Sequence, residues 1–109
     1  MPATYLIARI RIDDRDRYHE YQERFLPLFA TYAAEILAVD EATELLEGAW
    51  PYTRTVLLRF RDRDEARRFY DSPAYQELAR IRRAAAVADI VLVDAFDPAT
   101  LQPATGAQA

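Results

Sequence analysis

The sequence predicts an α+β fold with the ferredoxin-like element order βαββαβ. Its 109 residues, 51% of them apolar, suit one domain with one core. Stretches with an apolar residue at every second position alternate with stretches of helical spacing, in the order strand, helix, strand, strand, helix, strand. Right-handed crossovers would then place both helices on one side of a four-stranded antiparallel sheet.

The first strand and the first helix have the clearest patterns. Residues 5–12 predict a strand because apolar side chains alternate along it. Asp13 or Asp14 can cap the helix that follows, by accepting hydrogen bonds from its free amides. The buried stripe of this helix consists of Tyr18, Tyr21, Phe25, Leu28, Phe29 and Tyr32. Pro27 removes one backbone hydrogen bond, so we expect a kink near residues 23–27.

The middle of the chain predicts a strand hairpin. Two short apolar runs, 35–39 and 43–47, are separated by Asp40-Glu41-Ala42. The segment 48–51, Gly-Ala-Trp-Pro, then interrupts the sheet, and pairing resumes over 53–60. We interpret the pieces on either side of the interruption as one long or bulged strand region.

The second half predicts two short helices and a last strand. Asp62 and Glu65 resemble a capping box. Ser72-Pro73 ends one helix and begins the next, because proline disfavours helical geometry in the preceding residue but suits the first helical position. The next helix is expected over 73–86 and the last strand over 90–96. We therefore expect one domain over residues 1–96 and a flexible C-terminal tail over 97–109.

The second face of the predicted sheet is also apolar. Helices cover one face, yet the other carries Tyr5, Ile7, Leu57, Val91 and Val93. In water these side chains would form a large exposed patch for a monomer. Covering about 600 Å² of apolar surface is worth on the order of 15 kcal/mol before association costs. We expect a homodimer with the two sheets packed face to face about a two-fold axis.

Composition argues against several classes of function. Acidic residues outnumber basic ones 18 to 14, so no nucleic-acid partner is expected. With no cysteine and one histidine, no metal site is expected. There is no Gly-x-Ser-x-Gly motif and no glycine-rich phosphate loop, which disfavours hydrolases, kinases and nicotinamide dehydrogenases. We expect no cofactor. No signal peptide or membrane-spanning run is evident, so a cytoplasmic protein without membrane contact is expected.

Several motifs, in their order and spacing, resemble a known family. They are Tyr5-Leu6-Ile7-Ala8, Tyr18-His19-Glu20-Tyr21, Leu46-Glu47-Gly48-Ala49-Trp50-Pro51, Phe69-Tyr70-Asp71-Ser72-Pro73-Ala74-Tyr75-Gln76 and Ile90-Val91-Leu92-Val93. Over residues 4–96 the chain resembles the family of the domain of unknown function 1330. The resemblance implies a ferredoxin-like domain of the dimeric alpha-beta barrel superfamily.

That superfamily is home to varied chemistry. It includes cofactor-free monooxygenases that oxidise polyketide quinols, muconolactone isomerases, haem-degrading enzymes and chlorite dismutases, so the implied fold fixes no reaction. The chain departs from its family at the entry to the second strand. A glycine pair and a basic residue are usual there, whereas this chain has Ala33-Ala34-Glu35. The departure affects the turn that glycines allow and any site that the basic residue forms.

The candidate catalytic residues are His19, Glu47 and Arg54. His19 is the natural base candidate because an unperturbed imidazole can exchange a proton near neutral pH, although its helical position next to Tyr18 favours a solvent-facing side chain. Glu47 and Arg54 form a better constellation with Trp50, which can wall a pocket while the guanidinium binds a carboxylate or enolate. The alternative is a tight turn with a packed Trp50 and an internal Glu47 to Arg54 ion pair.

The candidate substrate-binding residues are Tyr18, Trp50, Arg59 and Tyr70. Tyr18 can equally be a core residue, and Tyr70 is also explained by the junction between the two helices. Arginines in an apolar sheet face, Arg59 and also Arg9, predict either dimer ion pairs or anion binding. A further arginine run is interpreted as a solvated helix face; it consists of Arg80, Arg82 and Arg83.

Two functional hypotheses remain open on the sequence. One is a cofactor-free oxygenase or isomerase acting on a small aromatic or enolisable molecule, in which an arginine stabilises developing negative charge. The other is a non-catalytic dimer module that binds a small molecule or assists a neighbouring enzyme. A cavity with an arginine and either His19 or Glu47 converging on it would favour the enzyme.

Overall fold

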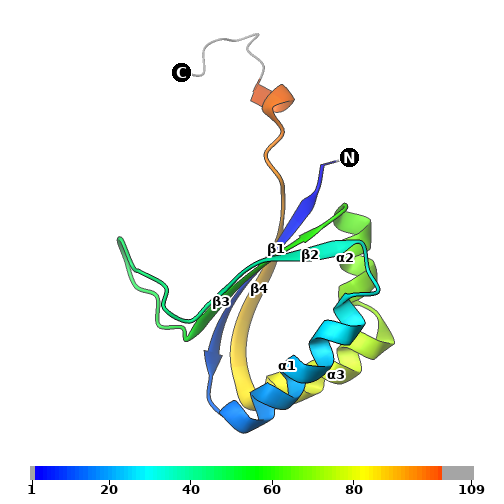
Figure 1. The fold of residues 1–109 in the computed structure, drawn as a ribbon. Coiled ribbons are helices and arrows are strands. Elements are labelled where there is room, and N and C mark those ends of the chain that lie inside the picture. Colours follow the sequence, from blue (N-terminus) through cyan, green and yellow to red (C-terminus); the bar gives the residue numbers. More distant parts are fainter. Residues whose placement is uncertain (1, 102–109) are drawn as a thin grey trace.

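The strands and helices follow the predicted order. The computed structural model describes residues 2–101. Its elements are β1 (Thr4–Ile12), α1 (Arg15–Phe29), β2 (Ala34–Asp40), β3 (Arg54–Phe60), α2 (Arg63–Tyr70), α3 (Pro73–Ala85), β4 (Ala86–Asp94) and a 3-10 turn, η1 (Pro98–Leu101). The strands form one antiparallel sheet in the order β2-β3-β1-β4. The helices lie on one side of this curved sheet (Figure 1). This is the predicted ferredoxin-like α+β fold.

The two central strands supply the floor of the core. In β1, Leu6, Ala8 and Ile10 face the helices and are buried, and across the sheet Leu58 and Phe60 of β3 are buried with them. The period of two therefore placed the inner face correctly. The three helices close the core from above with aromatic rings, among them Phe69 of α2 and Tyr75 of α3 at a centroid distance of 4.5 Å.

The helix boundaries are set by the predicted caps. Asp14 accepts a hydrogen bond from the Arg17 amide at 3.1 Å and begins α1. Helix α1 continues through Pro27 to Phe29 without a break. Between α2 and α3, Ser72 Oγ accepts from the Tyr75 amide at 3.1 Å and donates to the Phe69 carbonyl at 2.8 Å. One serine thus satisfies backbone groups of both helices, as Ser72-Pro73 predicts.

The predicted strand over 43–47 is wrong. Strand β2 ends at Asp40, which pairs with Thr55, so residues 41–53 have no strand partner. They form a loop that projects away from the sheet (Figure 1), and Leu46 in it is 86% exposed. The adjacent Leu45 and Leu46 made this segment look like a strand in the sequence, but no neighbouring strand pairs with it. The irregularity in pairing lies in β2, between Ile36 and Ala38, and not across the Trp50 segment.

The last strand begins earlier than predicted. Helix α3 ends at Ala85 and β4 starts at Ala86, not at Ile90. Ala86 and Ala88 face the core, while Val87 and Asp89 face outward. Small alanine side chains hid this alternation in the sequence. Part of the expected tail, 102–109, lies outside the described residues.

Glu65 anchors the turn from α1 into β2. Its side chain is 3% exposed and accepts from the Ala33 amide at 2.9 Å and from Arg68 at 2.8 and 2.9 Å. Arg68, and then the Ala33 amide, lower the pKa of this carboxyl from 4.5 to about 2. Within residues 2–101 no residue other than Gly48 has a positive φ, so Ala33-Ala34 needs no glycine pair.

Replacing Glu65 by glutamine is expected to destabilise the fold by about 2 kcal/mol at neutral pH, because charged hydrogen bonds are lost in a buried position. The folded-state pKa lies below the ordinary value, so the stabilisation is present above pH 4.5 and is lost as the pH falls towards 2. Urea unfolding at neutral pH and near pH 3 measures both effects. The exposed Glu20→Gln is the control, and equal stabilities of the two variants at neutral pH would contradict the anchoring role.

Candidate functional site

A cavity of about 270 Å³ lies between the helices and the inner face of the sheet. Its floor consists of apolar side chains from the four strands: Leu6, Ala8, Ile10, Ile36, Val39, Val56, Leu58 and Ile90. Its walls are aromatic rings from the helices: Tyr18, Tyr21, Phe25, Phe69, Tyr70 and Tyr75. Arg54, Arg82 and Gln22 add polar groups to this lining. An apolar chamber with a few polar groups is the usual form of a small-molecule site.

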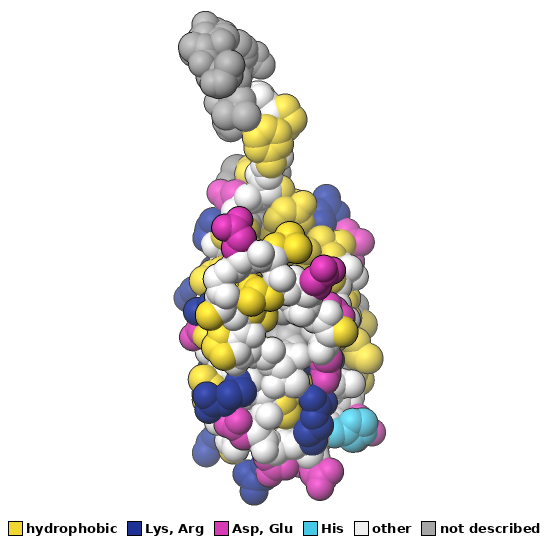
Figure 2. Space-filling model, turned by 90° about the vertical axis from the view of Figure 1, so that its left-hand side faces the viewer, with side chains coloured by type: hydrophobic (Ala, Val, Ile, Leu, Met, Phe, Trp, Pro, Cys, Tyr) yellow, Lys and Arg dark blue, Asp and Glu magenta, His cyan; other side chains and the backbone are white. Residues whose placement is uncertain are grey.

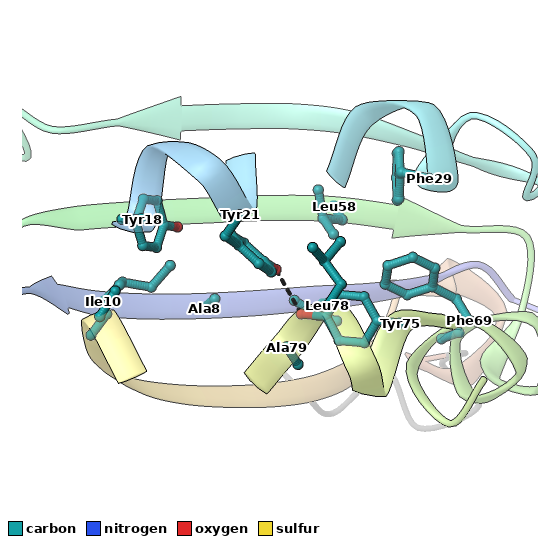
Figure 3. Packing of buried hydrophobic residues seen from close by; sticks show 14 of the residues in the cluster. Ala8, Ile10, Tyr18, Tyr21, Phe29, Leu58, Phe69, Tyr75, Leu78 and Ala79 are labelled. Carbon is teal, nitrogen blue, oxygen red and sulfur yellow. Dashed lines mark hydrogen bonds between the residues drawn. The ribbon is translucent and has the colours of Figure 1, made fainter. Parts of the chain in front are cut away.

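Two tyrosine hydroxyls meet inside the cavity. Tyr21 from α1 and Tyr75 from α3 point towards each other (Figure 3), with their oxygens 2.7 Å apart. Burial, together with the Tyr75 hydroxyl, raises the pKa of Tyr21 well above 10. Burial also raises the pKa of Tyr18. Tyr18 and Tyr21 are therefore neutral at physiological pH and act as hydrogen-bonding groups.

Arg54 lies where β3 begins and lines the cavity. Its side chain is 13% exposed, and Nη1 donates to Glu41 at 2.7 Å. The guanidinium carbon lies 5.4 Å from the centroid of the Tyr18 ring. Its Nε is buried and has no hydrogen-bond partner. One face of the guanidinium is thus fixed by Glu41, while a donor remains for a ligand.

Arg82 reaches the same cavity from α3. The residue is 5% exposed, and its guanidinium carbon lies 5.9 Å from the centroid of the Tyr21 ring. Its Nε is also buried without a partner. The interpretation of Arg80, Arg82 and Arg83 as one solvated face is wrong for Arg82. It follows Leu78 by four residues and Tyr75 by seven, and this helical spacing places it on the buried face of α3.

Three of the seven predicted site residues line the cavity together: Tyr18, Arg54 and Tyr70. The other four do not reach it. His19 lies on the outer side of α1 with its side chain 65% exposed, 3.3 Å from Glu23. Glu47 is exposed in the 41–53 loop, and the carboxylate that pairs with Arg54 is that of Glu41.

Trp50 and Arg59 belong to the outer face of the sheet. The Trp50 indole nitrogen donates to Thr55 Oγ1 at 3.3 Å, and Arg9 lies over the Trp50 ring at 5.5 Å. Arg59 pairs with Glu35 at 2.7 Å, and Arg9 pairs with Asp89 at 3.0 Å. Both arginines of this face are thus satisfied within the chain, so an anion ligand is not needed to explain them.

The sequence interpretation missed Tyr21, Tyr75 and Arg82 as site residues. Tyr21 and Tyr75 were explained by the core and by the helix junction, and a single sequence does not show that their hydroxyls meet. The helical register of Arg82 with Tyr75 was the one available signal. The sequence did not indicate Gln22 as a cavity residue, because a glutamine beside the buried stripe of α1 can equally face solvent.

Comparison with known families fixes the family of the chain. The family described as Domain of unknown function (DUF1330) matches residues 3–96. The chain belongs to this family. The DUF1330 match therefore covers every strand and helix around the cavity, from β1 to β4. A comparison with curated proteins finds no match.

Solved structures share the fold of this DUF1330 chain. A protein of unknown function from Rhodopseudomonas palustris has a TM-score of 0.75 at 13% identity, over 89% of this chain and 85% of that one. SnoaB, a cofactor-independent oxygenase from Streptomyces nogalater, has a TM-score of 0.65 at 17% identity, over 89% and 96%. A dimeric ferredoxin-like protein of unknown function from Thermobifida fusca has 0.61 at 18% identity, over 86% and 92%. At these identities the likeness shows the fold alone.

No helix in residues 2–101 is long and apolar enough to cross a membrane. The same residues contain no group of three or more His, Cys, Asp or Glu side chains placed to hold a metal ion.

Proposed function

We propose that the protein is a cofactor-free oxygenase that acts on a small aromatic or enolisable molecule in the cavity. The observation that carries this proposal is the buried Nε of Arg54, a charged donor without a partner at the wall of an apolar chamber. A guanidinium in such a place stabilises an enolate or phenolate better than water does, because the surroundings are poorly polarisable and the donor is already oriented.

The proposed reaction needs no external reductant. An activated CH₂ beside a carbonyl loses a proton to give an enolate, which Arg54 stabilises. The carbanion then forms a C–O bond with O₂, and the resulting peroxide anion takes up a proton. The hydroperoxide loses its remaining C–H proton as the O–O bond breaks, which releases water and leaves a new carbonyl. One CH₂ and one O₂ thus give one C=O and one H₂O, with the substrate supplying the electrons. Tyr18 would hold the ring of the substrate, and Tyr70 would form a wall of the chamber.

Oxygenation fits the cavity better than isomerisation does. An isomerase must take a proton from one carbon and return it to another, which requires a poised acid or base. The cavity lining contains no Asp, Glu or His, and the pKa values of Tyr18 and Tyr21 are raised. In oxygenation the proton lost from carbon can exchange with solvent before it ends on the departing water, and an arginine that lowers the pKa of the substrate itself is sufficient. The oxygenase activity stated for SnoaB supports the same choice.

We also propose that the protein acts as a homodimer through the outer face of the sheet. Ile7 and Leu57 lie in this face, and Val91 is 53% exposed on it. Figure 2 views the molecule from the side towards which the 41–53 loop projects and shows hydrophobic groups with charged groups around them. A relative of the same fold is described as dimeric. A second copy would cover the apolar side chains of this face, and the ion pairs of Arg9 and Arg59 would lie at the border of the interface.

Oxygen uptake tests the proposed reaction. Purified protein is incubated with anthrone and with a panel of smaller enolisable aromatic ketones, with and without a carboxylate group, and O₂ consumption is compared with the rate without protein. The proposal predicts saturable uptake with one water and one new carbonyl per O₂, confirmed by mass spectrometry with ¹⁸O₂. Uptake no faster than the protein-free rate across the panel would contradict it.

The second candidate is the non-catalytic dimer module that binds a small molecule. The same lack of a carboxylate or imidazole in the cavity lining favours it. The module predicts saturable ligand binding without any conversion of the ligand, so the ¹⁸O₂ experiment separates the two functions.

A further inference from the structure

The cavity contains a positive charge that has no carboxylate partner. The buried Arg82 forms no ion pair with any residue in the described range 2–101, and its Nε has no acceptor. Its nearest polar neighbours are the side chains of Tyr75 and Tyr21. A guanidinium remains charged in proteins, and burying it without an anion is costly. Burial disfavours the charged form, whereas the Tyr75 and Tyr21 side chains favour it and raise the pKa of Arg82, but neither supplies a countercharge, which a ligand carboxylate would supply.

Arg54 adds to the same charge. Its partner Glu41 also pairs with Arg15 at 2.8 Å, so these three side chains together carry one positive charge. Arg54 lies over the ring of Tyr18 and Arg82 over that of Tyr21, and the two rings are 5.5 Å apart. Both guanidiniums therefore border one end of the cavity.

The other end of the cavity is apolar. Phe25 and Phe69 form a T-shaped pair there with centroids 5.8 Å apart, and the neighbouring wall includes Leu58. In Figure 3, Tyr18 and Phe69 lie at opposite ends of the group of buried side chains. The chamber thus has a cationic end and an aromatic end, which suits an amphiphilic ligand lying along it.

We infer that the natural ligand is a small carboxylic acid with an aromatic or apolar body. Its carboxylate binds Arg82 at the end of the cavity that Tyr18 and Tyr21 border, and its body extends towards Phe25 and Phe69. This inference rests on the proposed function in that the same cavity is the ligand site. It adds a permanent negative charge to the substrate, separate from the enolate that forms beside Arg54 during the reaction.

Matched acids and amides test the carboxylate. 1-Naphthoate and 1-naphthamide share one body and differ in charge, and their dissociation constants are measured by ¹⁵N–¹H NMR titration. The wild type is expected to bind the acid at least about 10-fold more tightly than the amide, because a charge-assisted hydrogen bond is formed in a buried place. The Nε–Hε signal of Arg82 should shift downfield with the acid only.

Arg82→Met keeps the length of the side chain and removes the charge. It is expected to reduce the acid to amide ratio to about 1, whereas Arg80→Met, on the exposed side of the same helix, should leave the ratio unchanged. The wild-type ratio and the Arg82 signal need no variant, so the inference can be judged even if Arg82→Met folds poorly. Equal affinities for acid and amide in the wild type, a failure to bind either compound, or an Arg82→Met protein that keeps the preference would overturn it.

The outcomes of the two proposals differ. Preference for the acid in the absence of any oxygen uptake would remove the oxygenase and leave the carboxylate site of a binding module. Oxygen uptake with neutral ketones by a protein that binds acid and amide equally would remove the carboxylate site and leave the oxygenase.

Discussion

Arg54→Ala is expected to lower kcat/KM for oxygen uptake by about 100-fold, because it removes the preorganised charge beside the enolate. The fold should be retained. Glu41 keeps its ion pair with Arg15 at 2.8 Å, so the substitution leaves no unpaired carboxylate at the entrance of the 41–53 loop. The measurement is steady-state O₂ consumption at several concentrations of the substrate, with the thermal unfolding temperature recorded in parallel.

Arg24→Ala is the matched control for Arg54. Its guanidinium is exposed and pairs with Glu20 on the outer side of α1, so its loss should leave kcat/KM within about two-fold of the wild type. If Arg54→Ala and Arg24→Ala turned over substrate equally well, Arg54 would have no part in the mechanism. A loss that affected only KM would assign Arg54 to substrate binding rather than to the enolate.

Val91→Asp is expected to convert the proposed dimer into a monomer. Val91 lies on the outer face of β4, opposite Ile7 of the neighbouring strand. A two-fold axis would place two new carboxylates in one apolar interface, where burying unpaired charge costs more than the apolar contact can return. Light scattering at micromolar concentration should give the mass of two chains for the wild type and of one chain for the variant.

Ala74→Asp controls for the added charge. Ala74 is exposed at the start of α3, on the helical side of the molecule, and an acidic residue suits a helix N-terminus. This variant should remain dimeric. A wild-type protein that scatters as a single chain would contradict the dimer and leave the apolar outer face without a cover.

The fold could be predicted from the sequence because its determinants are local. Alternation in β1 and β3 and the caps at Asp14, Asp62 and Ser72 depend on residues close to one another in the chain. The errors arose where a local pattern lacked its tertiary partner. Leu45-Leu46 looked like a strand although no neighbouring strand reaches it.

The site was less predictable for a different reason. Arg54, Tyr18 and Tyr70 were found as single residues, but the cavity depends on three helices and four strands meeting. The Tyr21 to Tyr75 contact joins residues 54 positions apart. The ion-pair partner of Arg54 is Glu41, and the sequence does not distinguish Glu41 from Glu47, another carboxylate of the same loop. The burial of Arg82, within a run of arginines that was expected to face solvent, was the most informative difference from the sequence prediction. Only the helical register distinguishes Arg82 from Arg80 and Arg83.

The chamber under α1 and α3 is the proposed ligand site, and filling it tests that role directly. Ala8 lies in the cavity floor, so Ala8→Leu should occupy the chamber and leave the unfolding temperature close to that of the wild type. Ala79 is fully buried outside the lining, so Ala79→Leu should destabilise the fold by about 1 to 3 kcal/mol. The decisive measurement is ¹⁵N–¹H NMR titration with the neutral probe 1-naphthol. Saturable shifts are expected at Tyr18 and Tyr21 in the wild type and none in a folded Ala8→Leu protein, whereas equal binding by both proteins would place the ligand outside this chamber.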